Sequence, residues 1–156
     1  MFKKILVPLD GSSLAKKILP EVENLAKCHK SSVTFITVGS YREIFEAPPD
    51  VINEALAQEK VSGEKYLAHI VAEEKKKGLA ADYVYKEGMP ALEIIAYAAN
   101  NNIDLIAMAT HGKGEVVWVL GSVAEKVVSH ATVPVLLYRV LEAKQPRLKE
   151  EYFMGA

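Results

Sequence analysis

The sequence predicts one α/β domain built on a doubly wound, mostly parallel, five-stranded sheet. Short runs of apolar and β-branched residues alternate with longer segments whose apolar residues recur at helical spacing. The length of 156 residues suits one domain rather than two. The element order β-α-β-α-β-α-β-α-β requires crossover connections, which are right-handed in parallel sheets. We therefore expect the strand order 3-2-1-4-5, with helices on both faces.

The N-terminal segment predicts two strands and a helix. Ile5–Leu9 is a short apolar run that ends in the turn-forming residues Asp10–Ser13. Ala15–His29 has apolar residues at steps of three and four, which predicts one helix with a kink at Pro20. Ser32–Val38 is rich in β-branched residues and predicts the second strand.

The middle of the chain predicts a long helix, a strand and a shorter helix. Helix formers dominate Asp50–Lys77, and Gly78 supplies a C-terminal stop. Ala81–Lys86 alternates around aromatic and β-branched residues, as strands do. The next helix begins at Pro90, which suits a first turn, and ends at Asn100–Asn102. Its spacing predicts a buried face of Leu92, Ile94, Ile95 and Ala98.

The C-terminal third predicts the last two strands and the last helix. Ile103–Ala109 is almost entirely apolar, as expected for a strand covered on both faces. Ser122–His130 predicts a helix, and Val133–Tyr138 predicts the fifth strand. In the order 3-2-1-4-5, ligands bind at the carboxyl ends of the first and fourth strands, where the strand order reverses. Asp10 and the segment that begins at Met108 would line that crevice.

Composition narrows the class of function. Half of the residues are hydrophobic, a quarter are charged and the formal net charge is -1, which gives no reason to expect nucleic-acid binding. The longest apolar runs fall well short of the ~18 residues of a membrane helix, so no membrane association is expected. Cys28 is the only cysteine, and the N-terminus lacks a secretory h-region. We expect a cytoplasmic protein with Cys28 as an inert, half-buried helix residue.

The loop from Met108 to Ser122 carries the chemistry. Gly112, Gly114 and Gly121 bracket a short apolar insert. Glycine lets the backbone approach a phosphate closely, and the N–H groups at the start of the Ser122 helix form an anion site. The loop contains neither a Walker A motif nor a GxGxxG fingerprint. On these features alone, simple turns and a phosphate site are equally good interpretations.

This loop, with Val123–Val127 and Val133–Leu136 after it, resembles the C-terminal signature of universal stress proteins. Lys4–Ser12 looks like the opening strand and acidic turn of that family, and Gly88–Pro90 and Ile103–Met108 match its later landmarks. The resemblance covers residues 1–140 and leaves 141–156 as a charged C-terminal extension. It implies a Rossmann-like, UspA-like fold and a stress-response regulatory module.

The resemblance also implies a site for an adenine nucleotide, with ATP as the expected ligand. Mg²⁺ or Mn²⁺ would bridge the phosphates, without protein ligands assigned to it. The implied contacts to the adenosine part are Pro8, Leu9, Asp10 and Val38. Those to the ribose and first phosphates are Met108, Ala109, His111 and Gly112, and those to the outer phosphates are Gly121, Ser122, Val123 and Ala124. Asp10 is equally well interpreted as an Asx-turn or helix cap, and His111 as a loop histidine that bonds its own backbone.

The loop departs twice from the nucleotide-binding pattern of the family, which is glycine, two residues, glycine, nine residues and Gly-Ser or Gly-Thr. Ala109 occupies the first glycine position, and only the eight residues Lys113–Leu120 separate Gly112 from Gly121. If Ala109 needed a positive φ, alanine would cost roughly 1 kcal/mol or more. An interaction protein that has lost nucleotide binding is therefore the alternative function.

Catalysis is less favoured. A slow ATPase or phosphotransferase would use His111 or Asp10 near a metal-bound phosphate, but no pair of base and nucleophile is identifiable, so no catalytic residue is assigned. His29, His69 and His130 lack a second ligand at metal-binding spacing, so no metal site is assigned to them.

Two surface features complete the prediction. The last strand, Val133–Tyr138, would form an apolar edge with unpaired backbone groups, and such edges recruit partners. Many members of the resembled family dimerise through this strand, so we expect a two-fold homodimer.

Lys75–Lys77 follows Glu73 and Glu74, and we interpret this charge run as a solvated helix end.

Overall fold

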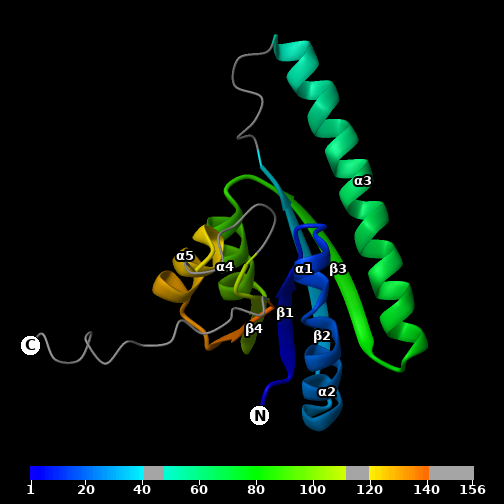
Figure 1. Cartoon of the computed structure of the whole chain (residues 1–156), viewed down its shortest axis with the longest axis vertical. Coiled ribbons are helices and arrows are strands. Elements are labelled where there is room, and N and C mark those ends of the chain that lie inside the picture. The colour runs from blue at the N-terminus through cyan, green and yellow to red at the C-terminus, as the bar shows by residue number, and fades with distance from the viewer. Residues whose placement is uncertain (41–47, 112–119, 141–156) are drawn as a thin grey trace, which may run out of the picture.

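The fold is a five-stranded parallel sheet with helices on both faces (Figure 1). The computed structural model describes residues 1–40, 48–111 and 120–140. The strand order β3-β2-β1-β4-β5 confirms the predicted topology. Because all pairings are parallel, the carboxyl ends of the strands share one edge of the sheet. The strands are β1 (Lys4–Pro8), β2 (Ser32–Gly39), β3 (Ala80–Glu87), β4 (Leu105–Ala109) and β5 (Val135–Tyr138).

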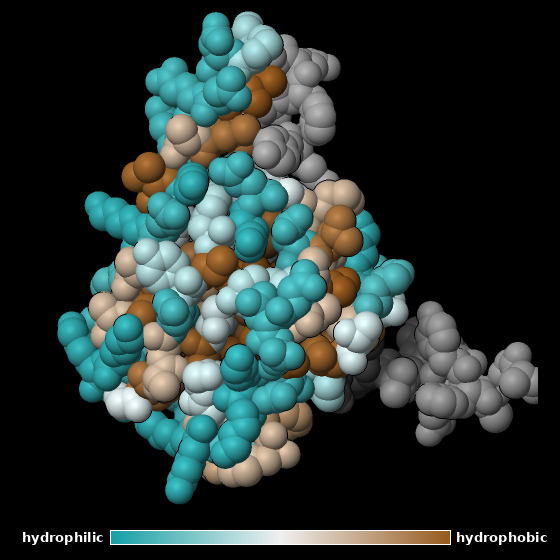
Figure 2. Space-filling view, turned by 180° about the vertical axis from the view of Figure 1, so that it is seen from behind, coloured by the Kyte–Doolittle hydropathy of each residue, from teal (hydrophilic) through white to brown (hydrophobic). Residues whose placement is uncertain are grey.

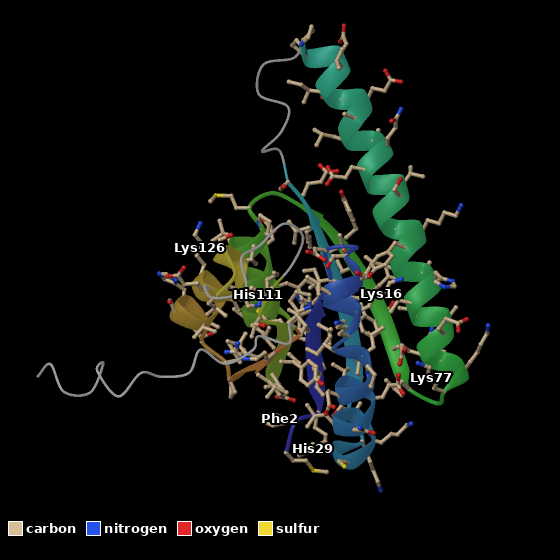
Figure 3. All side chains as sticks on the ribbon, viewed as in Figure 1. Phe2, Lys16, His29, Lys77, His111 and Lys126 are labelled. Carbon is tan, nitrogen blue, oxygen red and sulfur yellow. The ribbon has the colours of Figure 1, made fainter. Side chains whose placement is uncertain are left out.

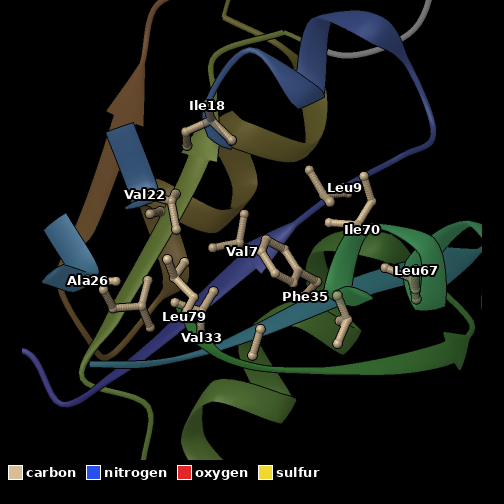
Figure 4. Packing of buried hydrophobic residues seen from close by; sticks show 14 of the residues in the cluster. Val7, Leu9, Ile18, Val22, Ala26, Val33, Phe35, Leu67, Ile70 and Leu79 are labelled. Carbon is tan, nitrogen blue, oxygen red and sulfur yellow. The ribbon is translucent and has the colours of Figure 1, made fainter. Parts of the chain in front are cut away.

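The helices divide between the two faces of the sheet, and each face has its own hydrophobic core. The cluster shown in Figure 4 joins residues of α1, α2 and α3 to β1 and β2, with Phe35 at 0% exposure. The second cluster joins α4 and α5 to the opposite face, around Ile106 and Val127. The helices are α1 (Ser13–Lys16), α2 (Leu19–His29), α3 (Pro49–Lys76), α4 (Pro90–Asn100) and α5 (Ser122–His130).

The first predicted helix is two helices, so the prediction of one kinked helix was wrong. α1 ends at Lys16 and α2 begins at Leu19, which places Pro20 in the first turn of α2. Proline has no N–H to donate, and in a helix interior its ring clashes with the carbonyl one turn earlier. The first turn has no such conflict, because its N–H groups lack intrahelical acceptors anyway.

Leu92, which was predicted to be buried, and Cys28, which was predicted to be half-buried, are both exposed. Leu92 is 59% exposed, because α4 buries Ala91, Ile94 and Ala98 and successive residues are about 100° apart around a helix. Cys28 is also exposed, because α2 turns its Val22 and Ala26 face to the sheet. Helical spacing correctly predicted that each helix has one buried face. Which residues form that face depends on how the helix is rotated against the sheet.

Helix α3 extends beyond the sheet. Its buried residues, Leu67, Ile70, Val71 and Glu74, all belong to its C-terminal half, and its N-terminal half projects past the carboxyl edge of the strands (Figure 1). Figure 2 shows this projection as the top of the molecule, with hydrophilic and hydrophobic side chains mixed on its surface. Where α3 meets the sheet, the ring of Tyr85 on β3 lies against Gly63. A Cβ atom at Gly63 would stand 2.5 Å from Cε2 of Tyr85, so a side chain there does not fit.

The charge run at the end of α3 is only partly solvated, which corrects the interpretation of a solvated helix end. Glu74 is 1% exposed, and its Oε1 lies 3.0 Å from Nζ of Lys77. The same ammonium lies 2.7 Å from Oε1 of Glu23 on α2, and these two contacts raise the pKa of Lys77 to about 12. Burial raises the pKa of Glu74 above its usual value, while Lys77 opposes that shift. Lys77 therefore links α2 to α3.

We expect Gly63→Ala to destabilise the protein by about 1–2 kcal/mol, because the new methyl group displaces the Tyr85 ring. In an exposed helix the same change would stabilise by about 1 kcal/mol, since alanine is the better helix former. Urea unfolding in the parent and in a Tyr85→Ala background measures both effects. The sign of the Gly63→Ala effect should reverse when the ring is absent, and equal stabilisation in both backgrounds would contradict the close approach.

We expect Glu74→Gln to gain stability relative to the parent as the pH rises from about 4 to about 8. A raised pKa means that the folded state binds the Glu74 proton more tightly than the unfolded state does. The stability that this proton provides is complete below the unfolded pKa, near 4.5, and is lost as the pH rises through the folded pKa. Urea unfolding across this pH range measures the difference.

Glu73→Gln is the matched control for Glu74→Gln. Exposed Glu73 has a pKa lowered by its hydrogen bond to Lys76, so its stability contribution is present above pH 4.5 and is lost as the pH falls. The two variants should therefore show opposite slopes against pH. A Glu74→Gln difference that stays flat would mean that folding does not shift the pKa of Glu74, and one that falls with pH would mean that the buried carboxylate is stabilised as an ion; either result contradicts the prediction.

Candidate functional site

The turn after β1 presents Asp10 at the carboxyl edge of the sheet. Asp10 is exposed, and its Oδ1 accepts a hydrogen bond of 2.9 Å from the N–H of Ser12. Gly11 has φ +81°, a conformation that L side chains rarely adopt. The hydroxyl of Ser12 accepts a 3.1 Å bond from the Ala15 N–H and caps α1. The Asx-turn predicted for Asp10 is confirmed, and Ser12, not Asp10, is the helix cap.

The residues before Asp10 support the turn from inside the protein. Pro8 is half-buried and pairs with Ile36 at the end of β1. Leu9 is 3% exposed; its N–H donates to the Ile36 carbonyl at 2.8 Å, and its own carbonyl accepts from Oγ1 of Thr37 at 2.7 Å. Both backbone groups of Leu9 are therefore bonded to β2. Val38, next along β2, is half-buried against the α4–α5 core.

The end of β4 forms the second part of this edge. Met108 and Ala109 are 5% and 8% exposed, and they pair with Leu137 and Tyr138 of β5. Ala109 is a regular strand residue and does not have a positive φ. The strain considered for alanine at this position is therefore absent. β1 pairs with β4 through Ile5 and Leu6, so the end of β4 and the Asp10 turn lie at the same edge of two neighbouring strands.

His111, two residues after the end of β4, is buried. Its side chain is 4% exposed, and Nδ1 lies 2.8 Å from Oγ1 of Thr110, whose N–H donates to the Tyr138 carbonyl at 2.9 Å. His111 therefore forms a hydrogen bond with the side chain of its neighbour Thr110. A bond to the backbone of His111 itself was the contact considered from the sequence. Figure 3 shows His111 between α1 and the α4–α5 pair. Gly112, a predicted contact, lies outside the described residues.

The amino end of α5 is held beside the end of β4. The N–H of Gly121 donates to the carbonyl of Thr110 at 3.0 Å, and the carbonyl of Gly121 accepts the Glu125 N–H at 2.8 Å. Ser122, the first residue of α5, is exposed at this edge. Val123 is half-buried and Ala124 is 3% exposed, and both pack on the core of that face. Their side chains therefore face the protein, and only their backbone N–H groups belong to the helix terminus.

The structure brings most of the predicted residues to one place. The Asp10 turn, the end of β4 and the amino end of α5 meet where the strand order reverses, and Val38 lies one strand further along. Sequence reasoning missed Thr110, whose carbonyl holds the amino end of α5 and whose N–H bonds to Tyr138 of β5. Its place directly after a buried strand was the only available signal.

The described residues contain neither a cluster of metal ligands nor a membrane-spanning helix. No group of three or more histidine, cysteine, aspartate or glutamate side chains could hold a metal ion there. Over the same residues, no helix is long and apolar enough to cross a membrane.

Comparison with known proteins agrees with this architecture. The model of the universal stress protein family matches residues 1–139. The universal stress protein YxiE of Bacillus subtilis is 33% identical, and the match covers 89% of this chain and all of YxiE. The structure of MJ0577 from Methanocaldococcus jannaschii is 28% identical and superposes with a TM-score of 0.84, over 92% of this chain and 99% of that one.

Two more distant structures share the fold and contain bound nucleotides. One is a universal stress family protein from Arabidopsis thaliana with AMP bound, 18% identical with a TM-score of 0.67, over 93% of this chain and 96% of its own. The other is a universal stress protein in complex with cAMP, 18% identical with a TM-score of 0.59, over 90% of this chain and 98% of its own. The family match over residues 1–139, together with the identity to YxiE and the shared fold, shows that this chain belongs to the universal stress protein family.

Proposed function

We propose that this chain is a dimeric cytoplasmic regulatory module that binds an adenine nucleotide, with ATP as its ligand. One observation carries the proposal. The bond from the Gly121 N–H to the Thr110 carbonyl holds the amino end of α5 at the carboxyl edge of β4, beside the strand that leads into Asp10. A helix amino end supplies N–H donors and a favourable dipole for phosphate, and an exposed carboxylate accepts hydrogen bonds from ribose hydroxyls.

The two ends of this edge suit the two ends of a nucleotide. At the β1 end, Asp10 is held by the Ser12 N–H, and half-buried Pro8 and Val38 offer apolar surface for a base. At the α5 end, Ser122 is an exposed residue, and its hydroxyl is a group that can donate to phosphate oxygens. The described residues offer no acidic cluster, so Mg²⁺ or Mn²⁺ would bind through the phosphates and not through the protein.

Two further observations support nucleotide binding. Fold relatives hold AMP and cAMP, which share the adenosine part expected beside Asp10. The regular backbone at Ala109 means that alanine replaces glycine there without conformational strain. The alanine at position 109 is therefore a weaker reason to expect that the chain has lost nucleotide binding.

The exposed edge of the sheet supports the homodimer. β5 pairs with β4 on one side and is the last strand of the sheet. Leu136 on this strand is 41% exposed, and an unpaired apolar edge favours pairing with a second copy. In the proposed dimer, β5 strands of two copies lie side by side about a two-fold axis. The single exposed Cys28 suits the reducing cytoplasm.

We expect the purified protein to bind ATP in the presence of Mg²⁺, measured by calorimetry and by chromatography of the nucleotide released on denaturation. Ser122→Ala should weaken binding about tenfold, since it removes a hydroxyl donor to a charged phosphate. Ser129→Ala, at the other end of α5, is the matched control and should bind as the parent does.

The alternatives give different results in the same experiment. No released nucleotide and no heat would indicate an interaction protein that does not use nucleotide. Metal-dependent loss of ATP that Asp10→Ala abolishes would indicate an enzyme. Equal effects of Ser122→Ala and Ser129→Ala would place the phosphates away from the amino end of α5.

We expect the parent to be a dimer and Leu136→Lys to shift it toward monomer, because a lysine on the edge strand disfavours strand pairing. Sedimentation velocity over a range of concentrations measures the shift. Leu92→Lys, which changes another exposed leucine but on α4, should leave the association unchanged. A parent that stays monomeric at high concentration rules out the proposed dimer.

A further inference from the structure

The end of α3 meets α2 near the amino ends of the strands, and Glu74 is the buried charge at this junction. Glu74 is 1% exposed. Its Oε1 lies 3.0 Å from Nζ of Lys77, while its Oε2 is buried and has no hydrogen-bond partner among the described residues. A buried carboxylate oxygen without a donor is unfavourable, because water no longer solvates it. The ionised form of Glu74 is therefore only half satisfied.

One ammonium holds two carboxylates at this junction. Nζ of Lys77 lies 3.0 Å from Oε1 of Glu74 and 2.7 Å from Oε1 of Glu23 on α2. Figure 3 places Lys77 at the end of α3. Because both carboxyl groups bond to the same ammonium, they lie next to each other. One positive charge does not balance two negative charges, so the fully ionised cluster keeps a negative charge beside a buried oxygen.

Glu23 and Lys77 are the charged groups that act on Glu74. On α3 itself, Glu73 and Lys76 pair with each other at 2.9 Å, and both side chains are exposed. The strands β2 and β3 contribute uncharged core residues on this side of the sheet, namely Val33, Phe35 and Ala81. The protonation of Glu74 therefore depends on burial and on these two partners.

The packing between α2 and the turn after α3 is incomplete. A cavity of about 350 Å³ lies there, lined by Lys27 and Lys30 at the end of α2 and by Leu79 after α3. The turn itself is held by the carbonyl of Glu74, which accepts the N–H groups of Lys77 and Leu79, both at 3.1 Å. Because the cavity reduces apolar contact at this junction, the polar link carries more of the attachment between the two helices.

We propose that Glu74, Glu23 and Lys77 form a proton-dependent latch between α2 and α3, which closes in mild acid and weakens as the pH rises. When the latch is closed, Oε2 of Glu74 binds one proton from solvent and donates it in a hydrogen bond to the carboxylate of Glu23. Lys77 stays bonded to both residues, and its charge balances the one negative charge that remains. When the proton returns to solvent, Oε2 has no hydrogen to donate and the two carboxylates repel each other.

The surroundings of Glu74 favour the proton. Burial raises the pKa of Glu74, Lys77 opposes that shift, and Glu23 adds to it through its charge and through a side-chain hydrogen bond. A raised pKa means that the stability from the bound proton is complete below the ordinary value of 4.5 and is lost as the pH rises through the folded-state pKa. The latch therefore responds above pH 4.5, where an exposed glutamate is already ionised.

A titration tests the shared proton directly. In ¹³C NMR of the glutamate carboxyl groups, with the Glu74 signal assigned from Glu74→Gln, we expect Glu23→Gln to lower the pKa of Glu74 toward 4.5. The reason is that the variant removes the negative charge that favours the proton. Glu21→Gln, which changes an exposed glutamate on the same helix, is the matched control and should leave the pKa unchanged. A Glu74 pKa that is the same in Glu23→Gln as in the parent overturns the latch.

Hydrogen exchange of the Leu79 amide measures opening at the junction, because this N–H donates to the Glu74 carbonyl. We expect its protection factor to fall about tenfold in the parent between pH about 5 and about 8, as the loss of one hydrogen bond to a charged group implies. Glu74→Gln places an NH₂ group where the protonated carboxyl has its hydroxyl, so it donates to Glu23 at every pH. Its protection factor should stay constant.

The Asn101 amide is the internal control, because it donates to the Tyr97 carbonyl at the end of α4, also at 3.1 Å. Its protection factor should not depend on pH in this range. A Leu79 protection factor that is constant in the parent, or that falls equally in Glu74→Gln, overturns the latch. A fall at Asn101 as large as that at Leu79 would mean global loss of stability, and it also overturns a local latch. None of these measurements involves nucleotide, so they stand apart from the proposed function.

Discussion

β1 pairs in parallel with both β2 and β4, and the rest of the structure depends on this central position. Ile5, Leu6 and Val7 are all 0% exposed, because helices cover both faces of the strand. The amino end of β1 is anchored by Asp104, whose Oδ2 accepts bonds of 2.7 and 2.8 Å from the N–H groups of Lys3 and Lys4. At its other end, the helices after β1 and β4 leave toward opposite faces. The strand order therefore reverses at this edge, which is where doubly wound sheets bind their ligands.

Three hydrogen bonds that involve backbone groups position the candidate site at the edge of the hydrophobic core. Ser12 holds Asp10 in an Asx-turn, Thr37 holds the carbonyl of Leu9, and Thr110 holds the amino end of α5. Each bond joins the site to a strand or to the start of a helix, so the polar groups need little reordering to bind a ligand. The two faces contribute differently, because α5 supplies a helix amino end and the turn that leads into α1 supplies Asp10.

The loop after β4 differs in two ways from the glycine pattern of nucleotide-binding universal stress proteins, and neither difference conflicts with membership of the family. The first glycine of the family pattern falls at Ala109, which is a paired residue of β4. Strand backbone accepts alanine without strain, so this departure adds a methyl group at the end of β4 and does not change the conformation of the chain. The shorter insert between Gly112 and Gly121 remains the feature that distinguishes this loop. The bond between Gly121 and Thr110 holds the far end of the insert close to its start.

The sequence by itself determined the type and order of the elements, the strand order and the family, because periodicity and turn residues are local and parallel crossovers have one hand. It also placed Asp10 and the α5 amino end at one edge. Only the tertiary structure decided which face each helix turns inward, so Leu92 and Cys28 were assigned wrongly. It also decided contacts between distant segments, such as Lys77 with Glu23 and Lys16 with Tyr66. No spacing rule reports these, because they depend on how packed helices are rotated and not on the neighbours of a residue in the chain.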